Sequence, residues 1–175
     1  MFELGTYVAC IAEGTAEQII IELLLDQHLL IFEREKLIEE KVLRCRGANA
    51  FENRYLRKEY KAKITVFRIL DSRREKFKLS KMYQDKVDVI NIITAPEIEM
   101  LIILSEDRFK DYKKSNMKPS EFCIKVLKYR EVKSKEFVKK YFSDTDFLVA
   151  AIKKYVSVSN IRKGEKTLLD LLRTA

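Results

Sequence analysis

Runs of β-forming residues that alternate with helical stretches constrain the fold of this chain more than any other feature of its sequence. The clearest runs are residues 6–13, 63–70 and 87–93, and residues 41–46 form a shorter fourth candidate. Strands that are separated by helices favour a mostly parallel sheet with helices on its faces. We therefore predict an α/β fold with about four short strands, flanked by helices.

Helical patterns separate these strands and fill the C-terminal part of the chain. We expect one helix after Gly14, a second over residues 49–60, and a third with Pro96 at its first position. Residue types that favour helix N-termini predict further helices, which would begin at Ser120, at Ser134 and at Ser143 or Asp144.

The length of 175 residues suits one folded unit with a single core. We expect residues 1–175 to form a single domain, in which an α/β core over about residues 1–105 carries a helical extension over about residues 106–175. No run of about 18 apolar residues occurs, so no membrane span is expected. The three cysteines Cys10, Cys45 and Cys123 are odd in number and far apart, which predicts reduced thiols in a cytoplasmic protein.

Acidic residues follow three of the predicted strands. Glu13 ends the first strand, Asp71 follows residues 63–70, and Glu97 and Glu99 come shortly after residues 87–93. Binding sites of parallel sheets form at the carboxyl ends of the strands, and carboxylates are hard oxygen ligands suited to Mg²⁺ or Mn²⁺. The other interpretation is that these carboxylates cap helices and offset helix dipoles.

The motifs around these acids have the order found in a known family. They read Glu13-Gly14-Thr15-Ala16-Glu17, then Asp71-Ser72-Arg73, then Pro96-Glu97-Ile98-Glu99-Met100-Leu101. This order resembles Toprim domains, and is more closely similar to the small Toprim-like proteins of the RloB type found in bacterial mobile elements and phage-defence loci. The resemblance covers about residues 6–105, and it departs from the family where Arg73 replaces the second aspartate.

The resemblance implies a metal-dependent enzyme that hydrolyses phosphodiester bonds in nucleic acid. Glu13 and Asp71 would be the catalytic residues that hold Mg²⁺ or Mn²⁺, and Glu99 would assist as a further metal ligand. An arginine cannot ligate a metal, so Arg73 would instead contact a phosphate or pair with Asp71 or Glu13.

The charge distribution also favours a polyanionic partner. The formal net charge is +8, yet residues 1–40 hold nine acidic and two basic residues, so the remainder carries 33 basic against 18 acidic residues. Such asymmetry is typical of proteins that bind nucleic acid, and a solvated lysine-rich surface is the alternative. The arginines predicted to contact nucleic acid are Arg54, Arg57, Arg68, Arg73 and Arg74.

Two other classes of function stay open on the sequence. The loss of the second aspartate favours a non-catalytic module that binds nucleic acid or a nucleoprotein complex, such as an inhibitor of a host CRISPR or other defence nuclease. A small structural or regulatory subunit is the third reading.

Overall fold

A parallel three-stranded sheet organises the molecule. The computed structural model describes residues 2–57, 60 and 62–173. The strands β1 (Tyr7–Ala12), β2 (Ile64–Leu70) and β3 (Val87–Ile93) lie in the order β1-β2-β3, and both pairs are parallel. The α/β class and the three clearest predicted strands are thus confirmed, with boundaries that differ by one residue at most.

The predicted strand at residues 41–46 is reduced to one isolated bridge. The Leu43 N–H donates to the Cys10 carbonyl oxygen over 2.8 Å, and the Leu43 carbonyl accepts from the Ala12 N–H over 3.0 Å. The chain before it forms two short 3₁₀ turns, η1 (Arg34–Lys36) and η2 (Ile38–Glu40), and Leu37 makes a second isolated bridge to Val8. The prediction of a full strand was wrong, because only Leu43 of this segment pairs with β1.

The C-terminal segment lies along the opposite edge of the sheet. Lys166 forms a parallel bridge with Ile92, and its carbonyl oxygen accepts the Ile93 N–H over 2.7 Å. This contact brings residues near 160–167 beside the end of β3, far from their neighbours in sequence.

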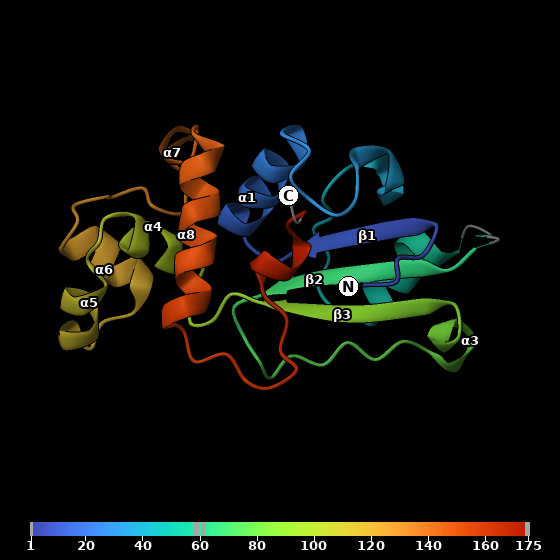
Figure 1. Cartoon of the computed structure of the whole chain (residues 1–175). Coiled ribbons are helices and arrows are strands. Elements are labelled where there is room, and N and C mark those ends of the chain that lie inside the picture. Colours follow the sequence, from blue (N-terminus) through green and yellow to red (C-terminus); the bar gives the residue numbers. More distant parts are fainter. Residues whose placement is uncertain (1, 58–59, 61, 174–175) are drawn as a thin grey trace.

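Helices cover both faces of the sheet and the region beyond its carboxyl edge (Figure 1). They are α1 (Thr15–Asp26), α2 (Ala48–Phe51) with a π turn η3 (Glu52–Leu56), α3 (Lys81–Gln84), α4 (Met100–Ser105), α5 (Phe109–Ser115), α6 (Pro119–Lys125), α7 (Lys135–Tyr141), α8 (Thr145–Val158) and the 3₁₀ helix η4 (Leu168–Leu171). Helices α4 to α8 gather beyond the carboxyl ends of the strands, whereas α3 lies at the opposite end (Figure 1). The predicted helical C-terminal part is therefore confirmed. No helix among residues 2–57, 60 and 62–173 is long and apolar enough to cross a lipid bilayer.

The helix boundaries agree with some of the predictions and differ from others. Ser134 and Asp144 cap α7 and α8 as predicted, since their side chains accept backbone N–H groups of the first turns. Pro96 does not begin a helix: it follows a cis peptide bond and lies in a turn, and α4 begins only at Met100. The helix predicted over residues 49–60 is the short pair α2 and η3, and its positions 58 and 59 lie outside the described residues.

Alternate residues of the strands enter two separate hydrophobic clusters. Val8 and Cys10 of β1 pack in a large cluster with residues of α1, α4 and α8, whereas Ala9 and Ile11 pack in a smaller cluster with Phe51 of α2. This alternation follows from the twofold side-chain period of a strand, so both faces of β1 are buried. The larger cluster joins the sheet to the C-terminal helices, which fixes those helices beside the carboxyl edge.

Candidate functional site

Five carboxylates line one pocket at the carboxyl edge of the sheet, and we call it the acidic pocket. They are Glu13, Glu17, Asp71, Glu97 and Glu99. The pocket has a volume of about 290 Å³ and also includes the basic residues Arg46 and Lys133. The three predicted metal ligands Glu13, Asp71 and Glu99 are thus brought to one place from distant parts of the sequence.

The turn between β1 and α1 places Glu17 in this pocket. The Glu17 carboxylate folds back over Gly14. It lies so close that a Cβ atom added to Gly14 would be only 2.1 Å from Glu17 Oε2. Gly14 therefore makes room for the carboxylate. Burial raises the pKa of Glu17, and the nearby negative charge of Asp71 raises it further.

The ends of β2 and β3 are held together just before the acidic residues. The Thr94 N–H and hydroxyl both donate to the Leu70 carbonyl oxygen, over 2.7 Å and 3.0 Å. The Tyr155 hydroxyl of α8 donates to the Ala95 carbonyl over 2.5 Å. These bonds fix Asp71, which follows Leu70, relative to the turn that carries Glu97 and Glu99.

Glu99 is the most deeply buried of the five carboxylates. Only 4% of its side chain is exposed, and Lys133 Nζ lies 3.8 Å from it. Burial raises its pKa to about 7, and the neighbouring carboxylates Glu97 and Glu17 add to that effect. The neighbouring Glu97 accepts the Ser120 N–H over 2.7 Å, at the start of α6. A cation that entered the pocket would relieve this repulsion between carboxylates.

Arg68 lies behind Glu13, inside the protein. Its guanidinium is only 2% exposed, donates to Glu75 over 3.1 Å, lies 3.6 Å from Glu13 Oε1 and stacks on the Phe77 ring. Burial raises the pKa of Glu13 to about 7, and the adjacent Glu75 carboxyl raises it as well, against the opposing effect of Arg68. Arg68 was expected to face nucleic acid, and its position instead suits it to hold Glu13 in place.

Glu75 is a site residue that the sequence reasoning missed. It lies four residues after Asp71, in the loop that follows β2, and its carboxylate lies against both Glu13 and Arg68. An acidic residue so soon after a strand-end aspartate was an available signal. Its contact with Glu13 was not, because 62 positions separate the two residues.

A wider groove opens beside the acidic pocket, and we call it the basic groove. Its basic residues are Arg73, Arg74, Lys118 and Arg162. The groove has a volume of about 710 Å³, and it shares Asp71 and Glu97 with the acidic pocket. A chain of phosphates bound along the groove would therefore pass beside these two carboxylates.

The two adjacent arginines of this groove differ in their contacts. Arg73 pairs with Glu165 through two bonds, Nε to Oε1 over 2.5 Å and Nη2 to Oε2 over 3.0 Å, and it also donates to the Asn160 carbonyl. The Arg74 side chain is exposed and has no partner in the part of the chain that the structure describes. Arg73 thus ties the C-terminal segment to the loop after β2, while Arg74 is available to a ligand.

The other two predicted arginines lie elsewhere. Arg54 lies over the Tyr55 ring at 5.3 Å, and Arg57 donates to Asn53 over 2.8 Å. Neither residue lines the acidic pocket or the basic groove. The five arginines predicted to contact nucleic acid therefore do not form one continuous surface.

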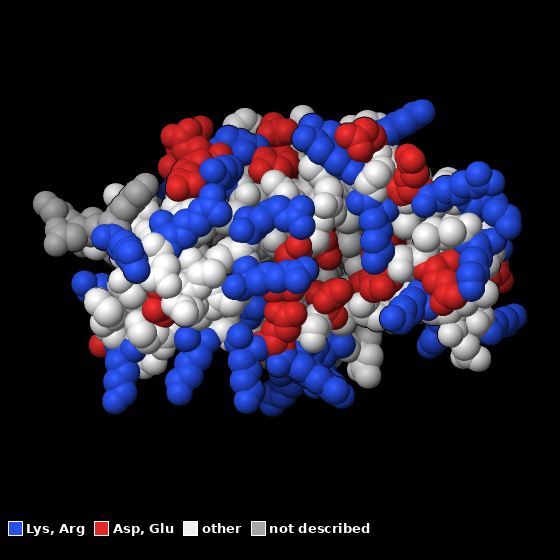
Figure 2. Space-filling model, turned by 180° about the vertical axis from the view of Figure 1, so that it is seen from behind, with Lys and Arg blue, Asp and Glu red and all other residues white. Residues whose placement is uncertain are grey.

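Acidic and basic side chains also lie beside one another on the surface of the face opposite to that of Figure 1. Figure 2 shows acidic side chains gathered near the middle of that face, with lysine and arginine side chains above and below them. A polyanion could thus contact lysine and arginine side chains on both sides of a central acidic region.

The residue types of the acidic pocket fit a hard divalent cation. Its donors are carboxylate oxygens, which Mg²⁺ and Mn²⁺ prefer. Within residues 2–57, 60 and 62–173, no three His, Cys, Asp or Glu side chains lie close enough together to hold a metal ion by themselves. Mg²⁺ usually keeps several water ligands and binds through one or two carboxylates, so the arrangement still fits this ion.

Comparisons of the chain with protein-family models, with curated proteins and with solved structures gave no match. The residues of the site themselves are therefore the basis for a functional proposal.

Proposed function

We propose that this chain is a Toprim-like protein that cleaves phosphodiester bonds in nucleic acid with the help of Mg²⁺ or Mn²⁺. The observation that supports it best is the sharing of Asp71 and Glu97 between the acidic pocket and the basic groove. Phosphodiester cleavage needs carboxylates for a metal and cations for the phosphate backbone at adjoining positions.

Each residue has a distinct role in this proposal. Glu13 and Asp71 would hold the ion, with Glu99 acting through a water ligand, and the bound ion would polarise the phosphate and activate a water. Arg74 binds the phosphate backbone, together with Lys118 and Arg162 of the same groove. Arg68 keeps the Glu13 carboxylate at the strand end.

A non-catalytic module is the second candidate, and one observation favours it. Three of the glutamates already have protein partners: Glu13 lies beside Arg68, Glu97 accepts from the backbone of α6, and Glu99 lies beside Lys133. Carboxylates neutralised in this way could be structural. In that case the chain would bind nucleic acid or a nucleoprotein complex of a phage or mobile element, for example as an inhibitor of a CRISPR or other defence nuclease.

Carboxylate substitutions separate the two candidates. Glu13→Gln and Asp71→Asn should each abolish Mn²⁺-dependent cleavage of single-stranded or duplex oligonucleotides, while affinity for the same oligonucleotides is kept. Asp88→Asn is the matched control, since Asp88 lies at the start of β3, where it pairs with Lys63 on the exposed surface. Its activity should equal that of the parent.

A thermal melt with and without Mn²⁺ completes the test. Binding to the native state stabilises it by about 2.7 kcal/mol when the free ion is at 100 times its Kd. The parent and Asp88→Asn should gain this stability, and the two site variants should not. If Mn²⁺ has no effect on the parent and no cleavage occurs, the enzyme proposal is rejected in favour of the binding module.

A further inference from the structure

A second large pocket lies at the opposite edge of the sheet, and we call it the tyrosine pocket. It has a volume of about 650 Å³ and lies at the amino ends of β2 and β3, where Leu56, Ile64 and Val87 supply apolar side chains. A seven-residue strand spans roughly 20 Å, so this pocket is well separated from the acidic pocket. Its volume is in the range of small-molecule sites, roughly 300–1,000 Å³.

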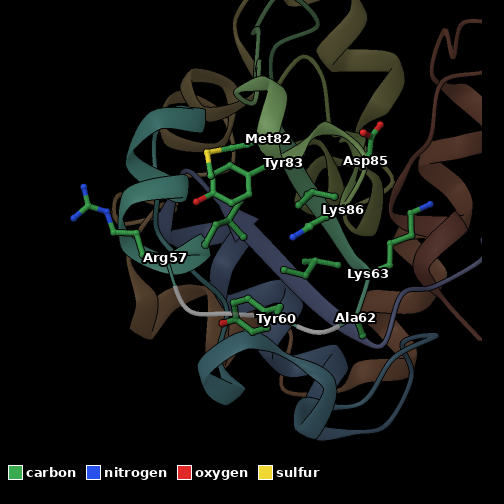
Figure 3. A pocket seen from close by; sticks show the side chains of 11 residues that line it. Arg57, Tyr60, Ala62, Lys63, Met82, Tyr83, Asp85 and Lys86 are labelled. Atoms are coloured by element: carbon green, nitrogen blue, oxygen red, sulfur yellow. The ribbon is translucent and has the colours of Figure 1, made fainter.

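Two aromatic rings and a methionine border this pocket. Figure 3 shows the Tyr60 and Tyr83 rings at two sides of the pocket, with the Met82 side chain beside Tyr83. Met82 is 70% exposed, so its side chain is accessible to a ligand in the pocket. Tyr60 is supported by an edge-to-face contact with Tyr7, whose ring lies 5.1 Å away. Such surfaces suit a flat, apolar ring system.

Three basic residues, Arg57, Lys63 and Lys86, and one carboxylate, Asp85, line the pocket. Lys63 is paired with Asp88 over 2.7 Å, and Arg57 donates to Asn53. Figure 3 shows both of these side chains pointing away from the middle of the pocket, whereas Lys86 lies between the two tyrosines. Among the described residues the Lys86 ammonium has no carboxylate partner.

The backbone holds Lys86 at a fixed position. Its carbonyl oxygen accepts the Ile64 N–H over 3.0 Å, and its N–H donates to the Tyr83 carbonyl over 3.1 Å. The lysine therefore projects from the end of the sheet beside the Tyr83 ring.

We infer that the tyrosine pocket binds a nucleotide, with the base against Tyr60 and Tyr83 and the phosphate on Lys86. A nucleotide joins a flat aromatic ring to a negative charge, and the pocket pairs aromatic walls with a free ammonium. The nucleotide could be free or one unit of a single strand, since both present the same groups. This inference does not rest on the proposed function, because it concerns other residues at the other edge of the sheet.

Calorimetry with four probes tests the inference on the full chain. The probes are AMP, adenosine, inorganic phosphate and a six-nucleotide adenine strand. We expect AMP or the strand to bind with a Kd of about 1 mM or tighter, and adenosine and phosphate alone to bind at least roughly tenfold more weakly. Binding of AMP identifies a free nucleotide as the ligand, and binding of the strand alone identifies a strand.

Two charge reversals provide the matched comparison. Lys86→Glu should weaken binding at least roughly tenfold, because a like charge would then face the phosphate. Lys81→Glu makes the same change on α3 but outside the tyrosine pocket, so it should leave the Kd unchanged. The inference is overturned if neither AMP nor the strand binds, or if both variants weaken binding equally. A thermal melt of each variant confirms that the fold is kept.

Discussion

Replacing Arg73 with alanine should loosen the segment that follows α8 without disturbing the rest of the fold. Arg73 is 26% exposed and Glu165 is 10% exposed, and two hydrogen bonds join them. Exposed ion pairs contribute about 0–1 kcal/mol, and hydrogen bonds to charged groups about 1.5–3 kcal/mol. Since this pair is partly solvated, we expect a loss of about 2 kcal/mol, which lowers the Tm by about 4–8 °C in a chain of this size.

Arg74→Ala is the matched control, because the two arginines are adjacent and only Arg73 has a carboxylate partner among the described residues. Urea unfolding followed by circular dichroism should show Arg74→Ala within about 0.5 kcal/mol of the parent. Hydrogen exchange should be faster at the Ile93 N–H in Arg73→Ala, since this group donates to Lys166 of the loosened segment. Equal stability of the two variants would refute the structural role of Arg73.

The pH dependence gives a second check on the same pair. Arg73 holds the pKa of Glu165 below its ordinary value of 4.5. A carboxyl whose pKa is lower in the folded state stabilises the fold above its unfolded pKa and loses that contribution on acidification. The stability difference between the parent and Arg73→Ala should therefore be complete at neutral pH and shrink as the pH falls below about 4.5. A difference that grows on acidification would contradict this assignment.

Two further substitutions test the support of Glu13 and the packing of the chain that leads into β1. Arg68→Met should lower the free energy of unfolding by about 3 kcal/mol in urea titrations, since it leaves the Glu13 carboxylate without its buried partner. Stability equal to that of the parent would contradict this role of Arg68. Gly5→Ala should lower the free energy of unfolding by about 2 kcal/mol in the same assay, because the added Cβ would lie 2.3 Å from the backbone carbonyl oxygen of Lys63. An unchanged urea midpoint would show that the backbone can move aside.

The sheet was predictable because its strands are continuous β-forming runs. All seven residues of β2 are buried, as expected for a central parallel strand, and its boundaries were read to within one residue. The segment around Leu43 has similar residue types, yet it lies between the turn η2 and the helix α2 and forms a bridge to β1 only at Leu43. Residue type alone does not show where such a segment turns.

The acidic pocket was predictable in part, for a different reason. The carboxyl ends of parallel strands meet at one edge, so Glu13 and Asp71 were expected near each other from topology alone. The burial of Arg68 was hidden, because an arginine within a strand is usually taken to point toward solvent. The pairing of Arg73 with Glu165 was hidden as well, since 92 positions separate the two residues.

The bridges on both sides of the sheet have a consequence for association between molecules. An unpaired outer strand offers a row of N–H and C=O groups to which another chain can add a strand. Here Leu37 and Leu43 occupy parts of the β1 edge, and Lys166 occupies the carboxyl end of the β3 edge. Within the described residues no isolated bridge lies on the first half of β3, where the ion pair of Asp88 with Lys63 places charged side chains beside the strand. The sheet should thus resist intermolecular strand addition even though it has only three strands.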